Sequence, residues 1–183
     1  MRWLMRSGAE GDRPGTRAEV LMVVLATGAG VIESLFPRPV PFMKPGLANI
    51  VTVAAVARFG MLTGLRVNLL RTAGAALVTG SLATPTYLLS LFGGIVSALV
   101  MGAFRRVLSV TGMSVCGSIS SLWTQLLAAS MLIPGLPAGA LLIPVSFWGF
   151  LSGVLTGIIA FAMLVRGFPW TGGKGVDSQG WAE

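Results

Sequence analysis

Residues 140–165 read ALLIPVSFWGFLSGVLTGIIAFAMLV and contain no charged side chain. A helix needs about 20 consecutive apolar residues to cross the hydrocarbon core of a bilayer, so this stretch is long enough to span it. Apolar blocks of similar length recur from Glu19 to Val165. The blocks are continuous rather than alternating, which favours helices over the strands of a membrane barrel.

The composition supports the same interpretation. The chain is 54% hydrophobic and 10% charged, with a mean hydropathy of +0.84, whereas a soluble domain carries about 25% charged residues. A water-facing surface cannot be built from so few polar side chains. We therefore expect an all-α integral membrane protein, a compact bundle of about six transmembrane helices of the usual length.

The apolar blocks and the prolines and glycines between them set the expected organisation. A disordered basic cytoplasmic tail is expected at 1–17, a six-helix transmembrane domain at 18–166 and a flexible cytoplasmic tail at 167–183. The expected spans are 18–36, 46–62, 65–82, 87–104, 114–133 and 140–165.

The basic residues predict the orientation. The net charge is +7, but these side chains gather at the ends of apolar blocks, as the positive-inside rule predicts, and form no nucleic-acid-binding stripe. Only Arg38 and Lys44, in the proline-rich connection 37–45, fall on the opposite side. We expect a multi-pass protein of the cell (inner) membrane with both termini in the cytoplasm.

The chain lacks the residues that several classes of function require. The chain has no histidine and a single cysteine, Cys116, and no GxxxxGK[ST] phosphate-binding loop. Only six residues are acidic. We therefore expect no metal site, no cofactor, no ATP hydrolysis and no catalytic set.

Polar residues near the outer ends of the spans are the candidate ligand-binding groups, because charges inside a membrane are costly and are often functional. Glu33, Arg38, Lys44 and Asn49 flank the proline-rich connection and are expected to lie close together. They form either a structural cap, in which Glu33 is neutralised by Lys44 or Arg38, or the rim of a pocket for an anionic or zwitterionic solute.

Arg71 and Gln125 complete the candidate set. Arg71 lies about two turns into its span, which makes an inward-facing partner more plausible than snorkelling to the interface. Asn68 and Gln125 are the possible partners. For Arg58, snorkelling is the ordinary interpretation.

Small residues at a spacing of four let helix backbones approach closely. Ala26, Gly30 and Ser34 lie on one side of the first span, and similar pairs occur in the fourth and sixth spans. These faces either pack within the bundle or, for the first span, form a docking surface for a partner subunit.

Three segments and one arginine resemble one known family, the Gx transporter family, also labelled heptaprenyl diphosphate synthase component I. The segments are ESLFP at 33–37, KPGLANI at 44–50 and SLFGGIVSALVM at 90–101, and the arginine is Arg71. The family is similar to the substrate-binding S components of energy-coupling-factor transporters, which are six-helix membrane proteins. The resemblance implies uptake of a small solute together with ATPase and coupling membrane subunits.

One position departs from the family pattern. Ser121 and Leu122 stand where the family usually has His-Asn, whereas Gln125 is retained. If that pair contacts the ligand, this chain binds a different ligand or has lost the activity.

The leading interpretation is therefore a solute-binding membrane subunit that takes up a small solute, whose identity the sequence does not give and for which a positive outer pocket favours an anion or a zwitterion. The alternatives are an accessory membrane subunit of heptaprenyl or polyprenyl diphosphate synthesis and a structural partner of another membrane complex.

The orientation predicts a labelling pattern. With single cysteines introduced in a Cys116→Ala background, an impermeant thiol reagent applied to intact cells should label Val40→Cys and leave Arg6→Cys unlabelled. The reverse pattern would show that the positive-inside assignment is wrong.

Overall fold

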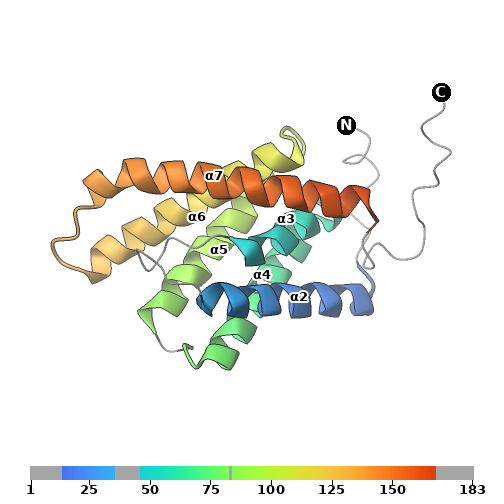
Figure 1. Cartoon of the computed structure of the whole chain (residues 1–183), viewed down its shortest axis with the longest axis horizontal. Coiled ribbons are helices and arrows are strands. Elements are labelled where there is room, and N and C mark those ends of the chain that lie inside the picture. The colour runs from blue at the N-terminus through green and yellow to red at the C-terminus, as the bar shows by residue number, and fades with distance from the viewer. Residues whose placement is uncertain (1–13, 36–45, 83, 168–183) are drawn as a thin grey trace.

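The computed structural model describes residues 14–35, 46–82 and 84–167, and the regular structure in these ranges is helical. Each helix coincides, within a few residues, with one of the expected spans (Figure 1). The helices are α2 (Thr16–Leu35), α3 (Leu47–Phe59), α4 (Met61–Thr79), α5 (Pro85–Phe104), α6 (Val110–Leu132) and α7 (Ala138–Val165). The all-helical class is confirmed. The two expected tails fall largely outside the described residues.

Four of the described helices, α2, α5, α6 and α7, are long and apolar enough to cross a membrane. Helices α3 and α4 are not among these candidate spans, for two different reasons. Helix α3 has only 13 residues, and α4 has the length but carries Arg66, Asn68 and Arg71. A membrane bundle with four candidate spans is therefore what the structure supports, and six crossings stay a prediction.

The ends of several helices follow from local sequence. Thr84 caps α5, its hydroxyl accepting a hydrogen bond from the Tyr87 N–H, and Pro85 occupies the first turn, where its missing donor costs nothing. Ser109 caps α6 in the same way. Gly80 ends α4 with a φ of 67°, a left-handed conformation that glycine adopts without strain.

Helix α3 lies at the centre of the bundle, between α2 and α7 in Figure 1, and also contacts α4, α5 and α6. All eight residues from 50 to 57 are buried. They are small or β-branched (Ile, Val, Thr and Ala), so neighbouring helices can approach from every side. Met22, Met101 and Met113 fill the remaining space in this core.

The outside of the bundle is apolar. Large side chains are more than half exposed on several helices, for example Ile32 on α2, Leu77 on α4 and Ile158 on α7. A soluble monomer rarely exposes so much contiguous apolar surface. These faces suit contact with lipid chains, in keeping with a membrane protein.

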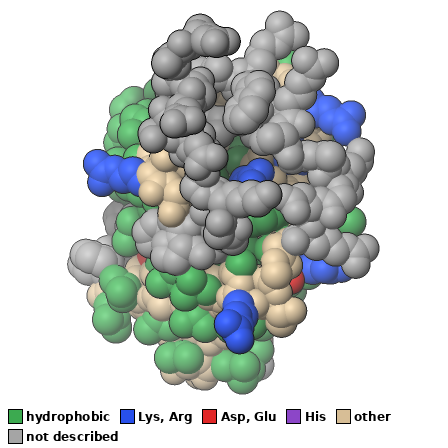
Figure 2. Space-filling model, turned by 90° about the vertical axis from the view of Figure 1, so that its right-hand side faces the viewer, with side chains coloured by type: hydrophobic (Ala, Val, Ile, Leu, Met, Phe, Trp, Pro, Cys, Tyr) green, Lys and Arg blue, Asp and Glu red, His purple; other side chains and the backbone are tan. Residues whose placement is uncertain are grey.

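One end of the bundle is basic. Six arginines lie at this end, near the starts of α2 and α4, in the last turn of α3, in the turn between α5 and α6 and at the residue after α7: Arg17, Arg66, Arg58, Arg105, Arg106 and Arg166. Figure 2 looks toward this end and shows Lys and Arg side chains around it. The distribution fits the expected cytoplasmic side, although the direction across the membrane stays a prediction.

Glycines bring α7 against α6. A Cβ added at Gly153 would lie 2.6 Å from the Val115 Cα, and one added at Gly157 would lie 2.7 Å from the Thr111 Cα. Because these obstacles are backbone atoms, they cannot move aside as a flexible side chain would. The sequence-based expectation of close backbone packing is confirmed for this pair.

Gly153→Ala should therefore lower the free energy of unfolding by about 1–3 kcal/mol, the usual cost of overpacking. Gly28→Ala is the matched control, since a Cβ there would meet nothing within 4 Å and alanine favours a helix. Thermal unfolding in detergent measures both. Equal melting temperatures for the two variants would contradict the α6–α7 packing described above.

Candidate functional site

Glu33 caps a helix to which it does not belong. Its side chain, near the end of α2, is only 3% exposed. One carboxylate oxygen accepts a hydrogen bond from the Gly46 N–H at 2.7 Å and the other from the Ala48 N–H at 3.3 Å. These donors open α3, whose own N-cap residue is a glycine without a capping side chain. Glu33 therefore supplies both the acceptors and the negative charge that a helix N-terminus favours.

Arg105 satisfies the opposite end of α3. Its guanidinium donates from Nε to the Ala57 carbonyl at 3.3 Å and from Nη2 to the Arg58 carbonyl at 3.4 Å. These carbonyls lie in the last turn of α3, where a positive charge is favourable. The central helix thus has an acid from α2 at its start and a base from the α5–α6 turn at its end.

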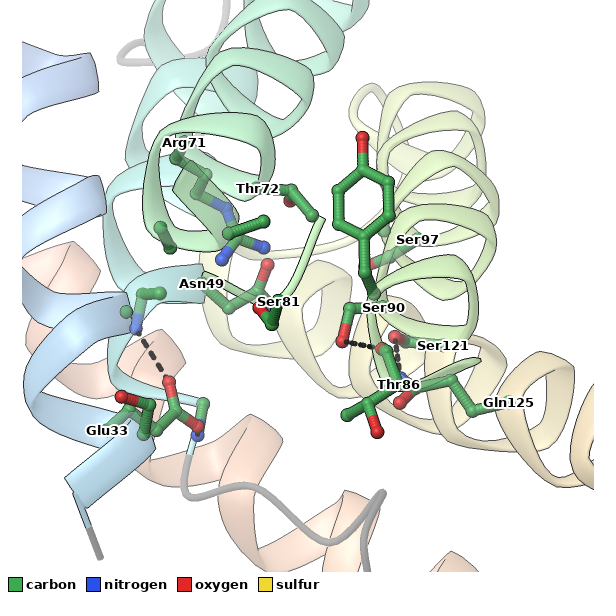
Figure 3. Close-up of a pocket in the computed structure, with 18 of the residues that line it drawn as sticks. Glu33, Asn49, Arg71, Thr72, Ser81, Thr86, Ser90, Ser97, Ser121 and Gln125 are labelled. Carbon is green, nitrogen blue, oxygen red and sulfur yellow. Dashed lines mark hydrogen bonds between the residues drawn. The ribbon is translucent and has the colours of Figure 1, made fainter. Parts of the chain in front are cut away.

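A cavity of about 620 Å³ opens beside the start of α3. A typical small-molecule site has a volume of about 300–1,000 Å³, so the cavity can enclose a metabolite. The cavity (Figure 3) lies between the ends of α2 and α4, the starts of α3 and α5, and the middle of α6 and α7. The arginine-rich end of the bundle is formed by the opposite ends of α2 to α5. The lining residues are Gly30, Glu33, Ser34, Gly46, Ala48, Asn49, Arg71, Thr72, Ala75, Ala76, Thr79, Ser81, Thr84, Thr86, Tyr87, Ser90, Gly94, Ser97, Ser118, Ser121, Leu122, Gln125 and Ser152.

Hydroxyl groups dominate this lining. Twelve of the lining residues are Ser, Thr or Tyr. On α5, Thr86, Ser90 and Ser97 follow helical spacing and face the cavity, and on α6, Ser118 and Ser121 do the same. We call these five residues the hydroxyl wall. Figure 3 shows Thr86, Ser90 and Ser121 across the cavity from Arg71.

Two glycines let polar side chains lie against α5. A Cβ at Gly93 would lie 2.7 Å from the Gln125 Nε2, and one at Gly94 would overlap the Asn68 amide. The Gln125 amide donates to the Ser121 hydroxyl at 3.0 Å. The Gly93–Gly94 pair therefore makes room for an amide from α6 and an amide from α4.

Arg71 is held in place by a neutral group. Its Nε and Nη2 both donate to the Asn68 Oδ1, at 3.1 Å and 2.6 Å. Asn68 is fully buried, so it fixes one edge of the guanidinium without neutralising the positive charge. Among the lining residues that the structure describes, Glu33 is the single acid and Arg71 the single base.

Two buried polar atoms beside the cavity have no hydrogen-bond partner among the described residues. They are the Ser97 Oγ, in a residue only 2% exposed that lines the cavity, and the Asn68 Nδ2. A buried unpaired donor or acceptor costs about 1–3 kcal/mol. Such groups are expected where a ligand or ordered water completes the hydrogen bonding.

The structure brings together four of the six candidate residues. Glu33, Asn49, Arg71 and Gln125 all line the cavity, whereas Arg38 and Lys44 lie outside the described residues. Of the two partners considered for Arg71, Asn68 makes the hydrogen bonds and Gln125 instead bonds to Ser121.

The small-residue face of α2 lies inside the molecule. Ala26 is fully buried, a Cβ at Gly30 would lie 3.4 Å from the Ala75 Cβ, and Ser34 lines the cavity. These contacts match packing within the bundle, and docking of a partner on this face stays a prediction. The physical reason for the packing is that α4 crosses α2 where both have small side chains.

Most of the hydroxyl wall is not among the binding residues predicted from the sequence. Ser90 and Ser97 lie within the segment 90–101 that resembles the family, and Thr86 lies outside every predicted set. The available signal was a line of hydroxyl residues at helical spacing in an otherwise apolar span. Ser121 and Leu122, the positions of the family departure, both line the cavity.

Comparison with known proteins identifies one family. The model of the family described as heptaprenyl diphosphate synthase component I matches residues 22–163. This match confirms the family expected from the sequence motifs. No curated protein and no solved structure matches the chain significantly.

The capping role of Glu33 predicts a stability effect. Glu33→Ala leaves two helix N–H groups unpaired, so the free energy of unfolding should fall by at least about 2 kcal/mol. Glu33→Gln keeps an acceptor but loses the charge, and should cause a smaller loss. Glu19→Gln, an acid-to-amide change in the first turn of the same helix, is the control, and thermal unfolding in detergent is the measurement. A Glu33→Ala protein as stable as the control would exclude the capping role.

Proposed function

This chain belongs to the heptaprenyl diphosphate synthase component I family, and we propose that it is a membrane subunit that binds a small polar solute for transport. The observation that carries the proposal is the cavity of about 620 Å³ with hydroxyl, amide and guanidinium groups on its walls. In this proposal it acts like an energy-coupling-factor S component, with both termini in the cytoplasm and the cavity open to the outer side of the cell membrane.

The character of the lining argues for a polar solute. A prenyl chain is a hydrocarbon, and it can form no hydrogen bonds with the polar groups of this lining, among them the Ser97 Oγ that has no partner among the described residues. A sugar-sized or amino-acid-sized metabolite can satisfy them. The cavity is therefore suited to a metabolite better than to a polyprenyl product.

Energy for uptake would come from a partner. The sequence has no nucleotide-binding loop, and concentrative transport needs an energy source. We propose ATPase and coupling membrane subunits as that source. The lipid-facing sides of the outer helices leave room for such subunits, whereas the Ala26 face is occupied within the chain.

The family description favours a second candidate, a component of heptaprenyl diphosphate synthesis. The described residues contain no group of three or more His, Cys, Asp or Glu that could hold a metal ion. In this alternative the chain has no catalytic role and serves as a membrane partner of the synthase.

Blocking the cavity mouth tests the solute-binding role. Thr79 lines the cavity and is exposed, so Thr79→Trp should fill the entrance without disturbing the core. In a thermal-shift screen of the purified protein against polar metabolites, at least one compound should raise the melting temperature of the wild type but not of Thr79→Trp. Leu77→Trp is the control, because Leu77 is 66% exposed on the same helix and does not line the cavity.

The two functions give different results in a second experiment. The tagged chain is purified from its own membrane and its partners are identified by mass spectrometry. Co-purification with an ATPase supports transport, and co-purification with a prenyltransferase supports the alternative. A stabilising compound that acts equally on Thr79→Trp would place its binding site elsewhere and contradict the assignment of this cavity.

A further inference from the structure

The free edge of the Arg71 guanidinium points to the chemical class of the solute. A guanidinium has five N–H donors in a fixed planar arrangement. Asn68 Oδ1 accepts from Nε and from Nη2, which uses the donors along one edge. Both N–H groups of Nη1 and one N–H group of Nη2 have no hydrogen-bond partner among the described residues. Arg71 lines the cavity. The remaining donors form the Nη1–Nη2 edge, whose geometry matches the two oxygens of a carboxylate.

The charge balance favours a single negative charge. Glu33 acts on Arg71 through its charge, and its two carboxylate oxygens accept hydrogen bonds from the start of α3. A monoanion would complete the pairing of Arg71. A dianionic phosphate would bring a second charge into a partly buried site with no further cation among the described lining residues, and an unpaired buried charge is costly.

The opposite side of the cavity indicates what the rest of the solute carries. The hydroxyl wall faces Arg71 (Figure 3), and its Ser97 Oγ is buried without a described partner. Hydroxyl groups both donate and accept hydrogen bonds, so they pair best with hydroxyl groups on a ligand. Gln125 adds an amide to the same wall.

We infer that the cavity binds a small hydroxylated monocarboxylate, with its carboxylate on the Nη1–Nη2 edge of Arg71 and its hydroxyl groups against the hydroxyl wall. This inference rests on the proposed solute-binding function and specifies the solute class. Asn68 is then a positioning residue. Its Oδ1 accepts hydrogen bonds from Arg71 and orients the guanidinium, and it does not itself bind the solute.

Matched probes test this class. The purified full-length protein is titrated with glycerate and gluconate as hydroxylated monocarboxylates, with glycerol and glucose as neutral counterparts, with propionate as a carboxylate lacking hydroxyls, and with glycerol 3-phosphate as a dianion. The hydroxylated carboxylates should bind at least about tenfold more tightly than the other probes. The neutral probes lack charge-assisted hydrogen bonds to Arg71, propionate lacks hydroxyl groups for the hydroxyl wall, and glycerol 3-phosphate brings a second negative charge.

Substitutions assign the binding to Arg71. Arg71→Gln should weaken gluconate or glycerate binding about 10- to 100-fold. Arg71→Lys should recover part of the affinity, because lysine keeps the charge but lacks the two-pronged geometry. Arg66→Gln, which removes an exposed arginine of the same helix outside the cavity, should bind as the wild type does. Asn68→Ala should weaken the carboxylates but leave any binding of the neutral probes unchanged.

The outcomes separate this inference from the function on which it rests. Tightest binding by a neutral sugar or by the phosphate, abolished by Thr79→Trp, would overturn the monocarboxylate class and leave solute binding in place. Carboxylate binding that survives Arg71→Gln in a folded protein would also overturn it. Absence of binding by every probe, together with no stabilising compound in the metabolite screen, would overturn both.

Discussion

The constraint on which the structure depends is the need to satisfy both ends of α3. This helix has 13 residues and is therefore about 20 Å long, shorter than a hydrocarbon core of about 30 Å. Its middle is enclosed by the other helices, and the N–H groups of its first turn and the carbonyl groups of its last turn have no partners within the helix. Glu33 and Arg105 supply partners from neighbouring segments, each with the charge sign that the helix dipole favours.

The cavity follows from that arrangement. Because Glu33 reaches across from α2 to the start of α3, the two helices meet at this point, and the space beyond it is bounded by the end of α4 and the start of α5. The same acid also places a negative charge near Arg71, which helps to keep a guanidinium charged inside the bundle. One carboxylate thus has a structural role for α3 and an electrostatic role for the site.

Glycine and alanine positions determine how closely the walls approach. Gly153 and Gly157 bring α7 onto the α6 backbone, whereas Gly93 and Gly94 leave space for the amides of Gln125 and Asn68. Gly153 and Gly157 allow the backbones of α6 and α7 to come into contact. Gly93 and Gly94 instead allow two polar side chains to lie against α5. The distinction depends on which neighbour faces each glycine, and sequence spacing alone does not show it.

The sequence by itself determined the helical membrane class, the approximate positions of the helices and the concentration of arginines at one end, because apolar length and charge placement are local properties. It also singled out Glu33, Asn49, Arg71 and Gln125 as residues whose polarity needs an explanation. Only the tertiary structure decided that Glu33 caps α3, that Asn68 holds Arg71, and that Ala26 and Gly30 face inward. The first and third of these relations join residues from different helices and depend on how the helices cross. Asn68 and Arg71 share α4, and it is the folded side-chain arrangement that selects Asn68 rather than Gln125 as the partner of Arg71.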